Sequence, residues 1–490
     1  MDINTYLKGK LKEKNLQLED LITKSGSSKS TIYRVMTGAQ KPSKKLTAKI
    51  IQILGLNYKE QQELLYYFSI SDLDEYVIEA REALYDFLFK EKVNQVDKIE
   101  LVYYDDEKYI RTYDNILESI LEASQKDNFS CQFKLINCIS NSIIIPLSDL
   151  VSELMANKSE YTVEHLVNFS TYDYKNNINV LSNVIPLLTV DHYSLKYREE
   201  DNVPDHGFFH DFLMVNYSYC EADGNEVNTT LYITFLANNL SACYVIRHTA
   251  HALDFFGRNY DSLEKEYQPA LSSRKNLLEY VKTNIEMYSK HEVVVFTSEI
   301  LFSRVPFNVY ESVMARTTSL DEFLNFFFPK SYQEKDTETQ LSYLRELLTV
   351  IYEGTFVNKQ LDIYTKSGMI LFASTGTLTD HLEFLPAFNK EEVKEILESI
   401  KARDLDPKDP FNFAILKESY SDPSLCFAVE KDGALLVEKY IDSHTPFCMI
   451  KKANLSGLFI DFAYHYVPAM LAISRKEAHD FIDDLIEEYC

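Results

Sequence analysis

Two pairs of histidines are the clearest candidates for metal chemistry in this sequence. His206 and His210 are four residues apart, and His248 and His251 are three apart. A helix would therefore place the two imidazoles of each pair on one face. Asp211 and Asp254 follow closely and could complete a set of ligands. Neither segment contains the acid of an H-E-x-x-H motif, and the first contains a glycine, which disfavours a helix. We therefore expect ordinary histidines, with no bound metal and no cofactor.

Other catalytic signatures are missing from the sequence. The chain has 12 glycines among 490 residues, and none forms a phosphate-binding G-x-G-x-x-G or G-x-x-x-x-G-K-[ST] loop or the G-x-S-x-G turn of a nucleophilic serine. Paired carboxylates such as Asp105-Asp106 and Asp483-Asp484 recur along the chain and are typical of solvated faces. We expect no enzyme, although the large C-terminal part leaves that question open.

The cysteines and the apolar runs predict a cytoplasmic protein with no membrane partner. The seven cysteines, at positions 131, 138, 220, 243, 426, 448 and 490, form no C-x-x-C pair, which favours reduced thiols. The N-terminus has neither the basic nor the apolar region of a signal peptide, and no uncharged apolar run approaches the length of a membrane span.

Charge divides the chain into two unequal parts. Residues 1–60 contain 12 Lys and Arg against five acids, a net charge of +7, so the remaining 430 residues carry −32 of the total of −25. An asymmetry of this kind favours an anionic partner at the basic end. The acidic remainder would repel DNA, which would confine any contact with nucleic acid to the first sixty residues.

The basic end has helical spacing throughout. Apolar residues at intervals of three and four predict a first helix ending near Asn15 and a second ending at Gly26. A third helix is predicted from Ser28, a typical N-cap residue, to Gly38, and Pro42-Ser43 introduces a fourth. A helix, a tight glycine turn and a second short helix form the unit that fits a DNA major groove.

The segments Leu16–Leu21 and Gly26–Val35, with Gly38 and Pro42-Ser43 after them, resemble the helix-turn-helix of the phage-repressor (Cro/cI, or XRE) family. The similarity runs from Asp2 to Leu56. It implies a mainly α N-terminal helix-turn-helix domain over residues 1–70, with five helices, the fifth being 59–68.

The resemblance assigns eight side chains to the DNA interface. Arginine and lysine donate to guanine O6 and N7, and serine can bond to bases of either strand, so such groups on the outward face of the recognition helix suit base edges. The expected base-reading residues are Lys29, Ser30 and Arg34, with Tyr33 beside them. The expected phosphate contacts are Ser28, Thr37, Lys41 and Lys44.

One position departs from the family pattern. The family usually has glutamine at the start of the second helix, where its side chain contacts the DNA backbone. This chain has Leu18 at that position. We expect lysines at positions 8, 10, 12, 44, 45 and 49 to replace the electrostatic share of that contact.

A connecting helix is predicted over residues 71–92, with Ser71–Phe89 as its helical part. Its apolar residues follow a 4-3-4-3 spacing over two heptads, at Leu73, Val77, Ala80, Leu84 and Phe87. This pattern is consistent with a dimer seam and equally with a helix that packs on the rest of the chain. A homodimer would suit a palindromic operator with paired half-sites in double-stranded DNA.

A large α+β body is predicted after residue 92, with one region over 93–305 and a second over 306–490. The expected strands are Cys131–Ile139, Phe212–Cys220, Thr230–Phe235, Glu292–Thr297, Phe411–Leu416 and a hairpin over Cys426–Lys439 that turns at Asp432-Gly433. The expected helices are Asn115–Ala123, Ser262–Tyr288, Thr337–Tyr352, Lys390–Ala402 and Arg475–Tyr489.

These patterns together predict a sequence-specific, DNA-binding transcription regulator. The body is far larger than dimerisation requires, and its many Tyr and Phe side chains suit a pocket for an unidentified small-molecule or peptide effector. Two alternatives stay open: an enzyme with a DNA-binding head, and a phage or mobile-element repressor controlled by a protein partner.

Overall fold

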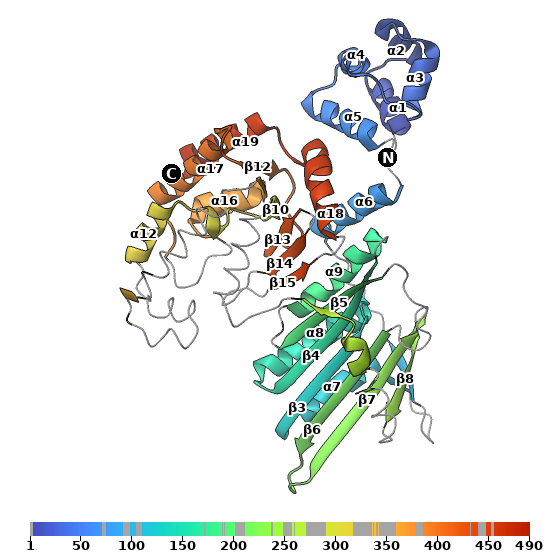
Figure 1. Ribbon diagram of the computed structural model, residues 1–490, viewed down its shortest axis with the longest axis vertical. Helices are drawn as coiled ribbons and strands as arrows, with labels where there is room; N and C mark the ends of the chain where they lie inside the picture. Colours follow the sequence, from blue (N-terminus) through green and yellow to red (C-terminus); the bar gives the residue numbers. More distant parts are fainter. Residues whose placement is uncertain are drawn as a thin grey trace.

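The computed structural model of the chain has two β-sheets and an N-terminal group of helices (Figure 1). It describes residues 3–70, 75–91, 99–103, 110–170, 173–188, 190, 192–200, 211–236, 239–247, 257–258, 260–270, 291–316, 336, 338–339, 342, 359–378, 386–431, 433–439, 447–451 and 455–490. No helix in these ranges is long and apolar enough to cross a membrane.

The N-terminal residues form five helices around a core of their own. Each of the five helices contributes buried apolar residues to this core, among them Leu7, Leu21, Ile32, Ile50 and Leu64. Two of the helices end at a glycine. Gly26 and Gly55 each follow the last residue of a helix and have a left-handed backbone, which terminates it. The helices are α1 (Ile3–Glu13), α2 (Leu18–Ser25), α3 (Lys29–Met36), α4 (Lys44–Leu54) and α5 (Tyr58–Ile70).

Helix α6 (Glu75–Phe89) joins the N-terminal helices to the body. Ala80, Leu84 and Phe87, which belong to the predicted heptad pattern, are buried in the largest core of the chain. The described part of the helix is therefore packed on its own body, and these three residues are not available as a dimer seam, whereas Ser71–Asp74, with Leu73 of the pattern, lie outside the described ranges.

The first sheet has nine strands in the order β2-β1-β8-β7-β6-β3-β4-β5-β9. It contains a β3-α8-β4-α9-β5 unit, in which helices α8 and α9 connect three neighbouring strands that pair in parallel. The strands are β1 (Glu100–Tyr103), β2 (Ile110–Thr112), β3 (Asp127–Ile136), β4 (Glu160–Ser170), β5 (Tyr193–Glu200), β6 (Asp211–Cys220), β7 (Glu226–Leu236), β8 (Asn239–Arg247) and β9 (Gln268–Pro269), and the helices are α7 (Tyr113–Ala123), α8 (Asn141–Ala156) and α9 (Tyr174–Leu188).

The second sheet has six strands in the order β12-β11-β10-β13-β14-β15. Three neighbouring strands are parallel and three antiparallel, and helices cover both faces. The strands are β10 (Val293–Phe296), β11 (Gln360–Thr365), β12 (Phe411–Leu416), β13 (Leu425–Glu430), β14 (Ala434–Lys439) and β15 (Phe447–Lys451), and the helices are η1 (Phe302–Arg304), α12 (Phe307–Arg316), α16 (Lys366–Thr375), α17 (Lys390–Leu405), α18 (Leu455–Asp461), η2 (Phe462–Leu471) and α19 (Arg475–Tyr489).

Helix η2 continues α18 as a π-helix, and it lies against the N-terminal helices. Pro468 lies inside it, and the N–H of Ala472 donates to the carbonyl of Val467, five residues earlier. Tyr466 and Met470 of this helix pack against the N-terminal core, where the ring of Tyr466 meets the ring of Tyr66 edge-on at 5.3 Å. The wide helix therefore forms part of the junction between the N-terminal helices and the body.

The α+β character of the body is confirmed, and so is the hairpin, since β13 pairs with β14 in antiparallel register. The predicted helix over Ser262–Tyr288 is wrong at Gln268–Pro269, which form the short edge strand β9 beside β5, and its residues after 270 lie outside the described ranges. Most of the predicted helix over Thr337–Tyr352 lies outside them as well. Strand β10 belongs to the second sheet although it precedes residue 306, where we expected the second region to begin.

Candidate nucleic-acid interface

Helices α2 and α3 are joined by a three-residue turn over Gly26–Ser28. Gly26 has a φ of +66°, a left-handed conformation that glycine adopts without the steric cost of a Cβ atom. Ser28 is the N-cap of α3, because its Oγ accepts the N–H of Thr31 at 3.1 Å. The turn is tied to α4 as well, because Lys49 Nζ donates to the carbonyl of Ser25 at 2.5 Å. These local contacts set the angle at which α3 leaves α2.

One face of α3 is buried and the other is open to solvent. Ile32, Val35 and Met36 lie in the N-terminal core, so the helical period turns the remaining side chains outward. All eight side chains that the sequence assigned to a DNA interface are exposed: Ser28, Lys29, Ser30, Tyr33, Arg34, Thr37, Lys41 and Lys44. They lie on α3, at its two ends and at the start of α4.

Tyr33 is unusual among these residues because it is a large aromatic side chain in solvent. It is 44% exposed, and the ammonium of Lys29 lies 5.7 Å from the centre of its ring. A cation at this distance is attracted to the ring face, so the pair is held together on the first turn of the outward surface. The ring offers an apolar contact and the ammonium a hydrogen-bond donor at the same place.

The hydroxyls at the ends of α3 already take part in the helix. Ser28 Oγ lies 2.8 Å from Thr31 Oγ1 in addition to capping the helix, and Thr37 Oγ1 donates to the carbonyl of Tyr33 at 3.0 Å. Because a phosphate needs a donor, the hydroxyl of Thr37 is less suited to it than the lysines nearby. The structure thus gives these two residues a role in fixing the ends of the helix.

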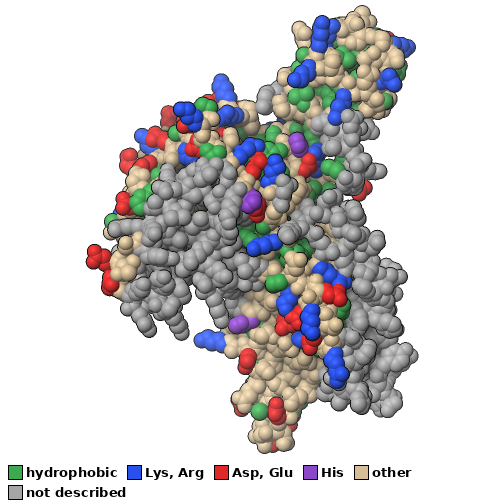
Figure 2. Space-filling view, viewed as in Figure 1, with side chains coloured by type: hydrophobic (Ala, Val, Ile, Leu, Met, Phe, Trp, Pro, Cys, Tyr) green, Lys and Arg blue, Asp and Glu red, His purple; other side chains and the backbone are tan. Residues whose placement is uncertain are grey.

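The surface around α3 is strongly basic. Between Asp20 and Glu60 the chain has no Asp or Glu and eight Lys or Arg, at positions 24, 29, 34, 41, 44, 45, 49 and 59. Figure 2 shows Lys and Arg side chains distributed over the N-terminal helices. Within the described ranges, no carboxylate forms an ion pair with Lys29, Arg34 or Lys44. Their charges are therefore not neutralised by these parts of the chain.

Three of the residues that we considered around the motif have other roles. Lys10 forms ion pairs with Glu13 at 2.9 Å and with Glu60 at 2.7 Å, and Lys49 caps α2 as described above. The expectation that these two lysines contact phosphate is therefore not supported. Leu18, which stands where the family has glutamine, is half-buried against the N-terminal core.

The absence of Asp and Glu between Asp20 and Glu60 is the sequence feature that indicates this basic surface most directly. It identifies Lys45 as well, which is exposed in the first turn of α4 beside Lys44. A helix start carrying two lysines and no acid attracts anions, because the lysine charges add to the positive end of the helix dipole.

The candidate metal ligands of the body are not brought together by the described residues. Both histidine pairs and Asp254 lie outside the described ranges, and Asp211 accepts the backbone N–H of Cys138 at 2.9 Å. The described residues contain no cluster of three or more His, Cys, Asp or Glu side chains with the spacing of a metal site. Burial raises the pKa of the Cys448 thiol to about 12, so this cysteine is an inert core residue.

Comparison of the sequence with protein-family models and with curated proteins finds no match.

Proposed function

We propose that the chain is a sequence-specific DNA-binding transcription regulator of the cytoplasm, with α2 and α3 as a helix-turn-helix of the Cro/cI type. The observation that supports this most strongly is the exposure of all eight expected contact residues on one surface that no acidic residue interrupts between Asp20 and Glu60. Such a surface is complementary to the phosphates of double-stranded DNA.

The roles of the side chains follow from their positions on α3. Arg34 and Lys29 donate to guanine in the major groove, and Ser30 hydrogen-bonds to a base of either strand. Tyr33 lies beside them and offers an exposed aromatic ring. Lys41, Lys44 and Lys45 meet phosphates beside the groove, where they fix the register of α3 but carry no information on sequence.

The proposed regulator is a homodimer on a palindromic operator, and its body responds to an effector. Because Ala80, Leu84 and Phe87 of α6 are buried within the chain, the second copy must associate through other residues. A dimer would place two α3 helices about one turn of DNA apart, and a change in the body would alter that spacing.

Selection of duplexes from a random pool by the full-length chain tests the proposal. We expect a preferred sequence and an affinity that falls by about 10³-fold between 50 and 200 mM salt if six phosphates are contacted. The double variant Lys29→Ala with Arg34→Ala should lose the preference. Lys126→Ala, an exposed lysine that follows α7, is the matched control and should behave like the original chain. No enrichment of any sequence, or equal binding by the double variant, would refute the proposal.

A further inference from the structure

Among the tyrosine and phenylalanine side chains whose burial the structure describes, Tyr33 alone is exposed. The chain has 34 Tyr and 30 Phe residues, and the others that are described are buried or half-buried. An isolated apolar group at a protein surface carries no information by itself. This ring, however, lies on α3 among Lys29, Ser30 and Arg34, the residues that we propose to contact bases.

The packing of α3 fixes the direction in which the ring of Tyr33 points. Ile32, which precedes it, is 0% exposed, and Val35, two positions later, is 1% exposed. The N–H and the hydroxyl of Thr37 both donate to the carbonyl of Tyr33, each at 3.0 Å. A rotation of the helix that buried the ring would bring these two core residues into solvent, so the ring stays on the outward face.

The ammonium of Lys29 forms a unit with this ring. Lys29 lies one helical turn before Tyr33, and its Nζ is 5.7 Å from the ring centre. Base pairs in DNA are stacked about 3.4 Å apart, so two groups at this separation reach neighbouring base pairs. An ammonium in the major groove donates to guanine O6 and N7. The unit therefore presents a donor for one base pair and an apolar ring for the next.

The chemistry of the major groove indicates the partner of the ring. The base edges there present hydrogen-bond donors and acceptors, and the methyl group of thymine is the apolar group among them. Contact between the ring and this methyl group removes apolar surface of both from water. A thymine is therefore the base that an aromatic side chain on the outward face of α3 recognises best.

We propose that Tyr33 and Lys29 together read a thymine–adenine base pair beside a guanine–cytosine base pair. The ring of Tyr33 contacts the thymine methyl group, and the ammonium of Lys29 donates to guanine. The assignment rests on the DNA-binding function proposed above and adds to it the identity of two neighbouring bases. It makes Tyr33 a specificity-determining residue that acts through an apolar contact.

The thymine contact is tested with the full-length chain on the selected duplex. Each thymine in turn is replaced by deoxyuridine, which lacks only the methyl group, and the ratio of the two dissociation constants is measured at low salt, where weakened variants still bind. At one position of a half-site we expect the original chain to bind about fourfold less tightly, the value of one buried methyl group. Tyr33→Phe should keep this ratio, and Tyr33→Ala should bring it to one.

Leu65→Ala is the matched control for the loss of an exposed apolar side chain. Leu65 of α5 is 43% exposed, against 44% for Tyr33, and belongs to the same group of helices. This variant should keep the fourfold ratio. If no deoxyuridine weakens binding by the original chain, or if Tyr33→Ala keeps the ratio, the thymine contact is refuted. A ratio of one with Tyr33→Phe would assign the contact to the hydroxyl and would also overturn the proposal.

The guanine contact is tested with a deazaguanine in which a carbon replaces N7. At the base pair beside the methyl-sensitive thymine, we expect this change to weaken binding by the original chain about fivefold, the lower end for a bidentate contact to guanine. Lys29→Ala should show no such loss. An equal loss with Lys29→Ala, or a loss only at guanines farther from the thymine, would refute the joint reading.

The outcomes separate this assignment from the function on which it rests. If selection yields no preferred duplex, the proposed function fails and the assignment fails with it. A preferred duplex that is insensitive to deoxyuridine would leave the proposed function standing and refute the role of Tyr33 alone.

Discussion

The guanidinium of Arg81 donates two hydrogen bonds to the carboxylate of Asp461, from Nε to Oδ2 at 2.6 Å and from Nη2 to Oδ1 at 2.8 Å. The two residues are 380 positions apart in the chain and lie on α6 and α18. A planar, bidentate pair fixes orientation as well as distance. It therefore holds the helix that leads to the N-terminal helices in one orientation on the body.

Removing the charge of Asp461 should destabilise this junction. Asp461→Asn leaves the Arg81 guanidinium buried without a counter-ion, and we expect a loss of about 3 kcal/mol, near the lower end for a broken buried pair because the carboxylate is partly exposed. Guanidinium-induced unfolding measures this change. Asp86→Asn on the same helix breaks the exposed pair with Lys90, the residue that follows α6, and should cost no more than about 0.5 kcal/mol. Equal effects of the two changes would show that the Arg81 pair does not support the junction.

The turn between α2 and α3 should depend on Gly26. An alanine at this position must adopt a left-handed backbone, so we expect Gly26→Ala to cost about 1 kcal/mol and to weaken DNA binding by displacing α3. Gly9→Ala is the matched control, because Gly9 lies inside α1 with no other atom within 4 Å of an added Cβ. This second change should stabilise the chain by up to about 1 kcal/mol. Thermal unfolding measures the change in stability of each variant. An increase in stability from Gly26→Ala would contradict the left-handed backbone at this turn.

Arg34 and Lys44 should affect DNA binding in different ways. We expect Arg34→Ala to cost about 1–3 kcal/mol on the selected duplex and to relax the preference at one base pair. Lys44→Ala should weaken selected and random duplexes by the same factor and reduce the salt slope by about one. Binding titrations at several salt concentrations measure both quantities. If the two variants lose the same factor on every duplex, Arg34 does not read a base.

The features that could be predicted from the sequence are those that neighbouring residues determine. The N-cap of α3 depends on Ser28 and Thr31, three positions apart, and the hairpin of β13 and β14 on a turn at Gly433. The exposure of the four predicted contact residues within α3 follows from the spacing of Ile32 and Val35, because a helix with one buried face turns the other face to solvent.

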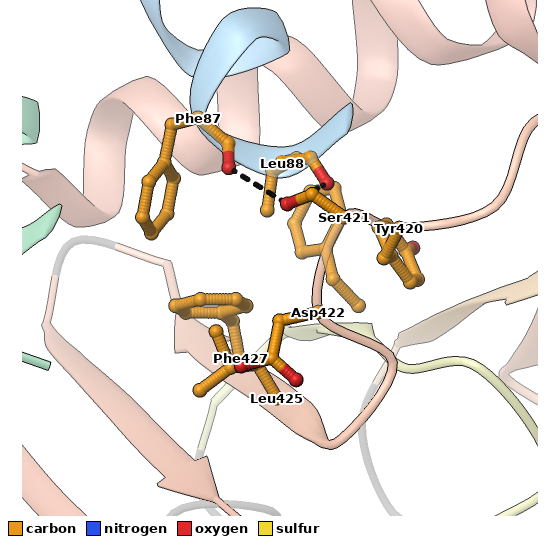
Figure 3. Close-up of a pocket in the computed structure, with 8 residues that line it drawn as sticks. Phe87, Leu88, Tyr420, Ser421, Asp422, Leu425 and Phe427 are labelled. Atoms are coloured by element: carbon orange, nitrogen blue, oxygen red, sulfur yellow. Dashed lines mark hydrogen bonds between the residues drawn. The ribbon is translucent and has the colours of Figure 1, made fainter. Parts of the chain in front are cut away.

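The remaining features depend on contacts between distant parts of the chain. Strands β4 and β5 have polar and charged residues among their apolar ones, and they are set in the sheet by parallel pairing across α9 rather than by a local turn. The contact between Arg81 and Asp461 and the hydrogen bond from Ser421 to Leu88 (Figure 3) each join segments more than 300 residues apart. No periodicity within either segment could indicate its partner.

A buried histidine should make the first sheet sensitive to acid. His165 of β4 is 0% exposed, its Nε2 contacts the carbonyl of Asn137, and its Nδ1 lies 3.0 Å from the hydroxyl of Tyr193. Since a carbonyl only accepts, Nε2 carries the proton and Nδ1 accepts from the tyrosine, which describes a neutral ring. Burial lowers the pKa of His165 from 6.5 to about 4.

Between pH 6.5 and pH 4, therefore, the unfolded chain binds a proton at His165 that the folded chain does not, and the free energy of unfolding falls as the pH falls through this window. The loss from this residue should reach about 3 kcal/mol by pH 4 and vanish above about pH 7. Denaturant unfolding from pH 4 to pH 8 measures it as the difference between the original chain and His165→Gln, which keeps a donor for Asn137 but cannot titrate. The variant should be less stable at pH 8 and lose less stability on acidification. Parallel pH profiles for the two chains would show that His165 is charged in the folded state or accessible to water.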